Sequence, residues 1–295
     1  MAFSASQAAL EGFRLVGRRP VSYVVWSLLP GAVIAALGLG GAWLFADQFS
    51  DVFSESKAPP GRVLEFIGEF FIAFLVGFAV MMIYLSVIYC AIYRAVLKPA
   101  ESGRAYLRFG RDEWNMFLLM MLSVVLVLAV ELAGVGIGVG IYATPLLTEA
   151  KFSLIAVVVL ALLALLPVVL VRWSLAGPVI VAEGRFDLGR AWSLTRGRLW
   201  AMVGMLLLAG ILGWVVSLAI ELVTRPLSMM IYDPYQATPP ALPQAWTRMW
   251  GLIEANPGPT AVVAVLLMLA TTLQTVVQLA PVAAAYRDIA DEGKG

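Results

Sequence analysis

The sequence predicts an all-α, polytopic membrane protein with six transmembrane helices, arranged as three hairpins with interfacial helices on the cytoplasmic side. Hydrophobic residues make up 61% of the 295-residue chain and charged residues 13%, whereas soluble domains have about 45–50% and about 25%. The apolar residues fall in six runs, each at least as long as the roughly 20 residues that cross a bilayer core. The basic residues gather in alternate connections between these runs, which gives the chain an orientation.

The six spans are expected at residues 21–45, 63–97, 114–142, 152–181, 199–223 and 260–286. The second and fourth are longer than a bilayer core needs, so we expect them to tilt or to kink at their prolines. Arginines precede the first span, as they would in a signal peptide. That span is longer than the roughly 7–15 apolar residues of a signal peptide, so we interpret it as a membrane helix.

The distribution of lysine and arginine predicts the orientation. The two termini and the connections after the second and fourth spans, with the adjoining ends of those spans, hold 15 of the 20 basic residues. Loops on the cytoplasmic side of a membrane carry an excess of lysine and arginine. Both termini are therefore expected in the cytoplasm, and six spans satisfy this parity.

Two of the basic connections resemble each other. Residues 103–114 and 189–200 both read Gly-Arg-Ala, an aromatic residue, seven further residues and Trp. The second and sixth spans also both have Tyr-Arg near their cytoplasmic ends, at residues 93–94 and 286–287. We interpret residues 1–295 as one membrane domain of three pseudo-repeats, 1–98, 99–182 and 183–295, each an interfacial helix and a hairpin. Helices are expected over residues 104–111 and 188–198. Chance similarity of sequence beside membranes is the alternative.

The connection between the fifth and sixth spans, residues 224–259, is rich in proline and is expected to be mostly irregular. Within it, Trp246, Met249, Trp250 and Ile253 have a helical spacing. This spacing predicts a short helix on the outer membrane surface, where tryptophan is common.

Carboxylates inside the spans are the candidates for a polar site, because ionisable groups in a bilayer are costly. Glu131 lies deep in the third span, Glu69 in the second and Glu221 near the outer end of the fifth. They could share an outward-open cavity, or Glu69 and Glu221 could reach interfacial water. We expect Glu131 to face the interior of the bundle. Gln274 and Gln278, one turn apart in the sixth span, could line a path or bond a neighbouring helix, the more common use.

Three arginines close the even-numbered spans, namely Arg94, Arg172 and Arg287. They could form a ring that binds lipid phosphates, because a guanidinium group suits phosphate geometry. The alternative is ordinary anchoring by positive charge at the inner face. Gly134, Gly136, Gly138 and Gly140 in the third span give two GxxxG spacings, which favour close helix packing.

Composition excludes several chemistries. The chain has no histidine, so histidine-based acid–base catalysis and histidine-ligated metals are excluded. Cys90 is the only cysteine, so no internal disulfide can form. The net charge of +1 gives no general attraction to nucleic acid. We expect no catalytic residues, no cofactor and no metal site.

One block of sequence resembles a known pattern. Residues 172–184 read RWSLAGPVIVAEG, and residues 191–197 read AWSLTRG. This block resembles the membrane domain attached to some bacterial glycerophosphodiester phosphodiesterases, and related six-span inner-membrane proteins of unknown function. In that family the activity belongs to a separate soluble barrel that uses histidines and acidic residues. The resemblance therefore implies a membrane module without the activity, located in the bacterial cytoplasmic membrane.

These observations favour a non-catalytic bacterial inner-membrane protein, either a scaffold or a module associated with lipid or the cell envelope. Membrane lipids are the expected partners, beside an unidentified protein. The alternative is a small transporter or channel that uses Glu131 with Glu69 or Glu221. A solvated cavity reaching Glu131 would favour transport, and a dry bundle would favour the scaffold. An intramembrane enzyme is disfavoured, because the chain lacks histidine and paired intramembrane aspartates.

Overall fold

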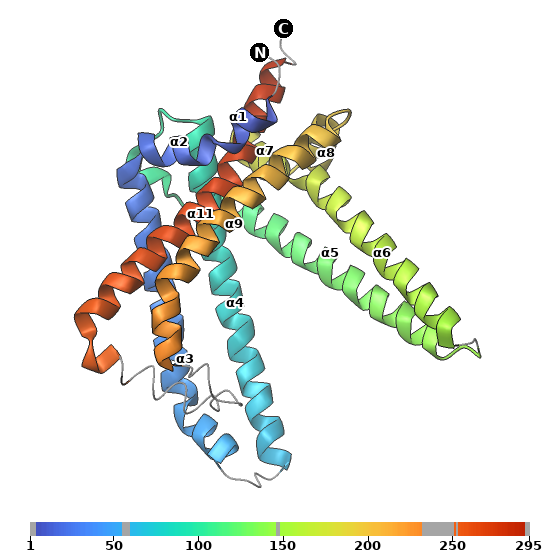
Figure 1. The fold of residues 1–295 in the computed structure, drawn as a ribbon. Helices are drawn as coiled ribbons and strands as arrows, with labels where there is room; N and C mark the ends of the chain where they lie inside the picture. The colour runs from blue at the N-terminus through green and yellow to red at the C-terminus, as the bar shows by residue number, and fades with distance from the viewer. Residues whose placement is uncertain (1–3, 55–59, 146–147, 232–250, 252, 293–295) are drawn as a thin grey trace. The chain divides into compact units, whose positions relative to one another are not determined.

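A computed structural model of the chain describes residues 4–54, 60–145, 148–231, 251 and 253–292 (Figure 1). Within these ranges the chain forms helices and no strands, which confirms the predicted all-α class. Six of the described helical segments are long and apolar enough to cross a membrane, as predicted. The protein is therefore a multi-pass membrane protein.

The helices have the following bounds. They are α1 (Ala5–Ala9), α2 (Glu11–Arg18), α3 (Pro20–Ser54), α4 (Pro60–Leu97), the 3-10 turn η1 (Gly103–Tyr106), α5 (Arg111–Tyr142), α6 (Thr148–Trp173), α7 (Ala176–Glu183), α8 (Leu188–Leu194), α9 (Leu199–Ile231) and α11 (Pro257–Glu292).

The fourth predicted span is two helices rather than one. It breaks between Trp173, the end of α6, and Ala176, the start of α7. Pro178 explains the break, because proline has no N–H and its ring clashes with the carbonyl four residues earlier. In the first turn of α7 this proline is tolerated, whereas a continuous helix would place it in the interior. Pro167, by contrast, lies within α6.

Two compact units make up the chain. Unit one consists of Met1–Glu11, Leu85–Leu208 and Leu279–Gly295, and unit two of Gly12–Tyr84 and Ala209–Gln278. Helices α2, α4, α9 and α11 contribute residues to both. The unit boundaries fall inside these helices and differ from those of the pseudo-repeats, which remain a prediction.

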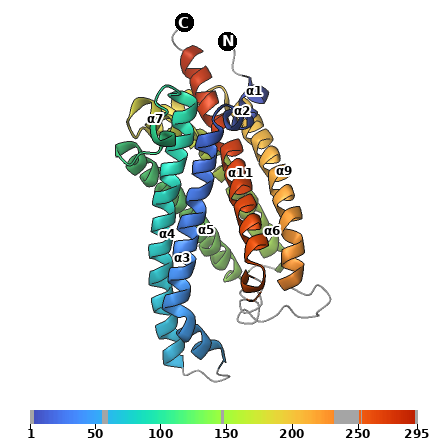
Figure 2. The ribbon, with the colours of Figure 1, turned by 90° about the vertical axis from the view of Figure 1, so that its left-hand side faces the viewer.

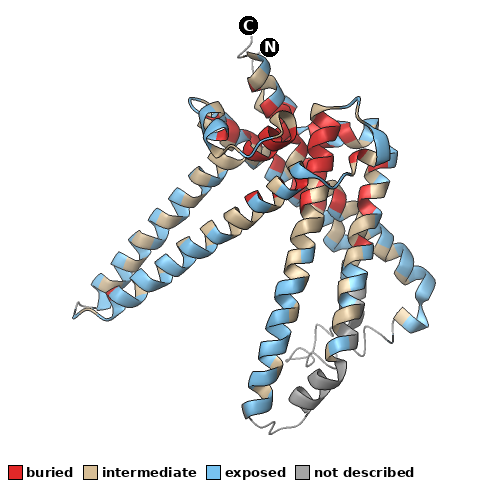
Figure 3. Ribbon diagram, turned by 180° about the vertical axis from the view of Figure 1, so that it is seen from behind, coloured by how far each residue is buried: buried red, intermediate tan, exposed pale blue. Residues whose placement is uncertain are grey.

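Unit one has its core at one end. Its buried residues come mainly from the end of α4, the start of α5, from α7, from the start of α9 and from the end of α11. Helices α5 and α6 pack against each other as a hairpin that is mostly exposed along its length (Figure 3), and α6 has no buried residue. At one end of unit one, α4 and α7 finish and α5, α8 and α9 begin. We call this end the basic end.

Unit two holds α3 and the first part of α4 side by side (Figure 2). Phe45 of α3 packs edge-on against Phe66 and Phe70 of α4, with ring centroids 6.2 and 5.8 Å apart. The Tyr23 hydroxyl of α3 donates a hydrogen bond to the Leu269 carbonyl of α11. A Cβ placed on Gly12 of α2 would lie 2.5 Å from Val277 Cα of α11, so only glycine permits this approach.

The helix predicted over residues 104–111 is wrong. Residues Arg104, Ala105 and Tyr106 have φ of 52°, 53° and 63°, a left-handed turn, and α5 begins only at Arg111. The turn is held from both sides. Arg94 Nη1 donates to the Tyr106 carbonyl (3.4 Å), and the Tyr106 hydroxyl donates to the Pro99 carbonyl (3.1 Å). These tertiary bonds override the helical spacing of the basic residues.

The helix expected over residues 188–198 is confirmed only as far as Leu194, since residues 195–197 form a turn. Helix α8 covers Leu188–Leu194, and α2 covers Glu11–Arg18 at the start of the first pseudo-repeat. The outer helix expected around Trp246, Met249 and Trp250 lies outside the described residues, apart from Ile253.

Candidate functional site: a polar pocket and an arginine at the basic end of unit one

The connection from α7 to α8 is shaped by its own sequence. Helix α7 is followed by its capping residue Gly184, whose φ of +69° is the left-handed conformation that favours glycine at a helix C-terminus. Helix α8 is capped at its start by Asp187, whose Oδ1 accepts a hydrogen bond of 2.8 Å from the Arg190 N–H. These two caps turn the chain within three residues. Glu183 and Arg190 are thereby placed on the same side.

Glu183 is the centre of a hydrogen-bonded cluster. Its Oε2 accepts from Arg185 Nε (3.0 Å) and Nη2 (2.7 Å). Its Oε1 accepts from Arg190 Nε (3.3 Å) and from the Tyr286 hydroxyl of α11 (3.1 Å). The side chain is 22% exposed, so solvent screens these pairs only in part. The cluster joins α7, α8 and α11 at the basic end.

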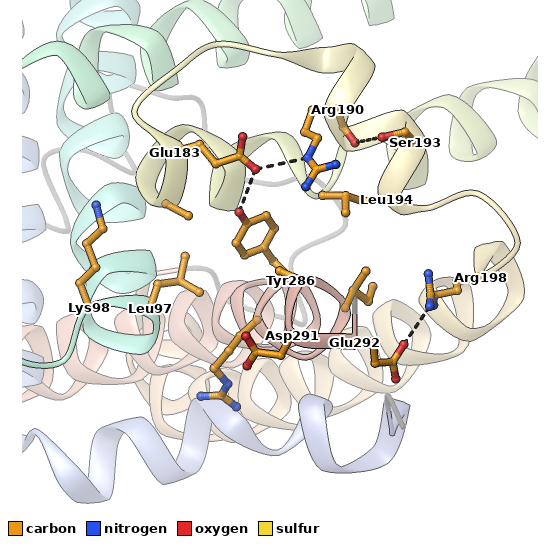
Figure 4. A pocket seen from close by; sticks show the side chains of 14 residues that line it. Leu97, Lys98, Glu183, Arg190, Ser193, Leu194, Arg198, Tyr286, Asp291 and Glu292 are labelled. Carbon is orange, nitrogen blue, oxygen red and sulfur yellow. Dashed lines mark hydrogen bonds and ion pairs between the residues drawn. The ribbon is translucent and has the colours of Figure 1, made fainter. Parts of the chain in front are cut away.

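A pocket of about 710 Å³ opens beside this cluster (Figure 4). Its lining carries four basic and three acidic residues as well as Tyr286. Its charged residues are Lys98, Arg190, Arg198, Arg287, Glu183, Asp291 and Glu292. Glu292 pairs with Arg198 Nη2 at 2.8 Å, which ties the end of α11 to the start of α9.

Lys98 is the exception among these charged groups. It lies one residue beyond α4, is half-buried, and makes no side-chain hydrogen bond or ion pair with any described residue. Figure 4 shows its side chain on the pocket wall, apart from the dashed bonds of Glu183, Arg190 and Arg198.

On the other side of α8, Arg172 of α6 stacks on Trp192. The Arg172 Cζ lies 5.1 Å from the centroid of the Trp192 ring, a cation–π distance. The Nε and Nη1 atoms of Arg172 are buried and have no hydrogen-bond partner among the described residues. Trp192 itself is 44% exposed. The pair therefore combines an arginine with unmet donors and an aromatic ring at the surface.

Comparison with known proteins places residues 25–289 in a family described as a domain of unknown function, DUF7847. The chain belongs to the DUF7847 family. The comparisons found no match among curated proteins and none among solved structures.

The three predicted arginines of this DUF7847 chain do not form a ring of equivalent groups. Arg94 is buried and pairs with Asp112 (3.0 Å) and Glu113, both near the start of α5. Its predicted contact with lipid phosphate is wrong, because these two carboxylates already hold its guanidinium group. Arg287 is 44% exposed, lines the pocket and bonds Asp288 through Nε. Only Arg172 keeps buried donors without a described partner.

The intramembrane carboxylates are exposed in this structure. Glu131 lies on α5 in unit one, whereas Glu69 and Glu221 belong to unit two. The Glu131 side chain is exposed within unit one, and the expectation that it faces the interior of the bundle stays a prediction. None of the three lines the pocket of unit one. A shared cavity stays a prediction.

The glutamines and glycines of the spans are partly explained. Gln278 of α11 lies against α9, where a Cβ on Gly213 would be 2.8 Å from its Nε2, while Gln274 is half-buried in the same unit. This contact fits the helix-packing interpretation of Gln278. In α5, Gly134 approaches Leu162 of α6, but Gly136, Gly138 and Gly140 have open space beside them.

Sequence reasoning did not single out Lys98, Glu183 or Tyr286 as site residues. A signal was present in the spacing. Glu101 pairs with Arg108 at 2.9 Å, and Glu183 pairs with Arg190 at 3.3 Å, so both connections carry a carboxylate seven residues before its arginine. The position of Tyr286 over Glu183 depends on tertiary packing of α11 and has no local signature.

Proposed function

We propose that the protein is a non-catalytic module of the bacterial cytoplasmic membrane that binds anionic lipid headgroups at its basic end. The observation that carries this proposal is Arg172, whose Nε and Nη1 are buried without a described hydrogen-bond partner while its guanidinium group stacks on Trp192. A buried donor left unsatisfied costs about 1–3 kcal/mol. A lipid phosphate that reached one of these nitrogens would supply the missing acceptor.

The chemistry of the pair suits a phosphodiester. A guanidinium group presents parallel N–H donors that match two phosphate oxygens. Stacking on an aromatic ring holds the guanidinium plane in place, so less conformational freedom is lost when the phosphate binds. A lysine at this position would supply the positive charge but not the parallel N–H donors.

The surroundings of Arg172 support a location among the headgroups. Trp114, Trp192 and Trp200 at the basic end are 51%, 44% and 83% exposed. Tryptophan is enriched where a membrane meets water. The excess of basic residues in these connections favours the cytoplasmic leaflet, whose anionic lipids attract arginine and lysine.

The non-catalytic part of the proposal rests on composition and on the resemblance to the phosphodiesterase membrane domains. The chain has no histidine, and the resembling phosphodiesterases keep their catalytic residues in a separate soluble domain. The transport alternative lacks similar support, since Glu131, Glu69 and Glu221 do not line the pocket of unit one.

Lipid titration with native mass spectrometry tests the proposal. The purified protein, in an uncharged detergent, is titrated with phosphatidylglycerol or with phosphatidylcholine. We expect the wild type to prefer phosphatidylglycerol and Arg172→Gln to lose that preference about tenfold or more, the loss of one charged hydrogen bond. Arg196→Gln is the matched control, because Arg196 is exposed in the same connection and makes no described side-chain contact.

Arg172→Lys separates charge from fork geometry and should recover only part of the preference. An Arg172→Gln protein that melts like the wild type and still prefers phosphatidylglycerol to the same degree would refute the proposal.

A further inference from the structure

We propose that the pocket of unit one is a second, separate binding site, which takes a phosphate-bearing group with Lys98 as its counter-ion. The group would be either a phospholipid headgroup or a soluble phosphate compound, which present the same chemistry to the pocket. Arg172 does not line this pocket, so the inference does not depend on the headgroup contact of Arg172.

The acidic residues of the pocket are already occupied. Glu183 accepts hydrogen bonds from two arginines and from Tyr286. Glu292 pairs with Arg198 at 2.8 Å. Asp291 also has an interaction within the chain. These carboxylates are therefore poorly placed to attract a cationic ligand.

The basic side of the pocket retains free charge. Lys98 has no ion pair with any residue that the structure describes. Arg287 bonds Asp288 through Nε at 3.4 Å, and none of the described residues is paired with its two Nη groups. A partly buried ammonium group without a counter-ion attracts anions strongly, since less water screens it. The uncompensated charge of this pocket is thus positive.

The dimensions and lining suit a small ligand. The volume of about 710 Å³ falls in the range of about 300–1,000 Å³ found for small-molecule sites. Leu97, Leu194 and Ile289 supply apolar surface beside the charged groups. In Figure 4, Lys98 lies beside Leu97, with Tyr286 between it and the Arg198–Glu292 pair. A phosphate at Lys98 would leave room for an apolar or hydroxylated remainder.

Isothermal titration with two probes tests the site. The whole protein, in an uncharged detergent, is titrated with inorganic phosphate and with dioctanoyl phosphatidic acid. We expect saturable binding that Lys98→Met weakens about tenfold or more, the loss expected for a charged hydrogen bond. Lys98→Arg should keep binding within about threefold, since the charge is retained. Lys151→Met is the matched control, because Lys151 does not line the pocket. It lies in the first turn of α6 and donates a hydrogen bond to the Tyr142 carbonyl.

The two probes distinguish the sources of the phosphate. Lys98-dependent binding of both probes supports the shared chemistry. Binding of phosphatidic acid alone supports a lipid headgroup, and binding of inorganic phosphate alone supports a soluble ligand. Arg287→Gln serves as a second variant should Lys98→Met fail to fold, and it should also weaken binding. Arg172→Gln should leave the Lys98-dependent binding in place.

Two results would overturn the inference. One is the absence of saturable binding of either probe to the folded wild type. The other is unchanged affinity in a Lys98→Met protein that melts at the wild-type temperature.

Discussion

Arg94 at the end of α4 and Glu113 in the first turn of α5 form an ion pair whose two side chains are only 4% and 1% exposed. Glu113 also accepts a hydrogen bond of 2.9 Å from the Gly110 N–H through its other oxygen. Arg94 reaches the Tyr106 carbonyl and Asp112 as well. The pair therefore holds the left-handed connection between α4 and α5 in place at the basic end of unit one.

Arg94→Met should strongly destabilise the protein, because it leaves the Glu113 carboxylate buried without its counter-ion. Breaking a buried pair from one side costs about 3–5 kcal/mol. The measurement is thermal unfolding in detergent, with Arg108→Met as control. Arg108 pairs with Glu101, but both side chains are about half-exposed (50% and 41%), and such pairs contribute about 0–1 kcal/mol. Equal losses in the two variants would contradict the role given to Arg94.

Gly177→Ala should destabilise the contact between α7 and α4. A Cβ at this position would lie 2.5 Å from Tyr93 Cε2, and Tyr93 is only 4% exposed, so the ring has little room to move. Overpacking of this kind costs about 1–3 kcal/mol. Gly204→Ala in α9 is the matched control, because open space surrounds that glycine. The control should melt at or above the wild-type temperature, and a similar loss in both would argue against the close approach.

The orientation can be read by labelling single cysteines in intact cells. In a Cys90→Ala background, Gly103→Cys should react with an impermeant maleimide only after the cells are opened. Thr148→Cys, at the start of α6, should react from outside. The positive-inside distribution of lysine and arginine gives this expectation. Labelling of Gly103→Cys in intact cells would show that the orientation is the reverse of the predicted one.

Glu131→Leu should leave thermal stability in detergent unchanged within about 1 kcal/mol, the range of surface substitutions. The carboxylate is exposed on α5 and makes no hydrogen bond or ion pair with the described part of the chain. Glu131→Gln, which keeps the size and most hydrogen bonding, should behave alike. A marked loss of stability in Glu131→Leu alone would show that the carboxylate has a partner and would favour the inward-facing interpretation.

The six spans could be predicted from sequence because their signal is local, namely long apolar runs between basic connections. The break before α7 was less accessible, since Pro167 and Pro178 look alike in sequence and only the second interrupts the helix. The turn at Arg104 was mispredicted because the contacts of Arg94 and Tyr106 with other parts of the chain decide its backbone. The pocket could not be predicted either, because Lys98, Glu183 and Tyr286 come from separate segments of the chain and only tertiary packing brings them together.

Two of the arginines have the same local sequence but different surroundings, which the sequence pattern does not predict. Tyr93-Arg94 and Tyr286-Arg287 have the same sequence at the ends of two spans, yet Arg94 is buried among carboxylates and Arg287 is exposed at the pocket. The difference comes from the stretch of chain after each arginine. Asp112 and Glu113 return to Arg94 at the start of α5, whereas α11 is the last helix among the described residues.

The most direct test of the proposed function is a structure of the protein crystallised from a lipid mesophase containing phosphatidylglycerol. We predict a lipid phosphate oxygen about 2.7–2.9 Å from Arg172 Nε or Nη1, the distance of charged hydrogen bonds. The guanidinium group should remain stacked on Trp192. Protein oxygens bonded to both nitrogens, with lipid phosphates elsewhere, would contradict the proposal.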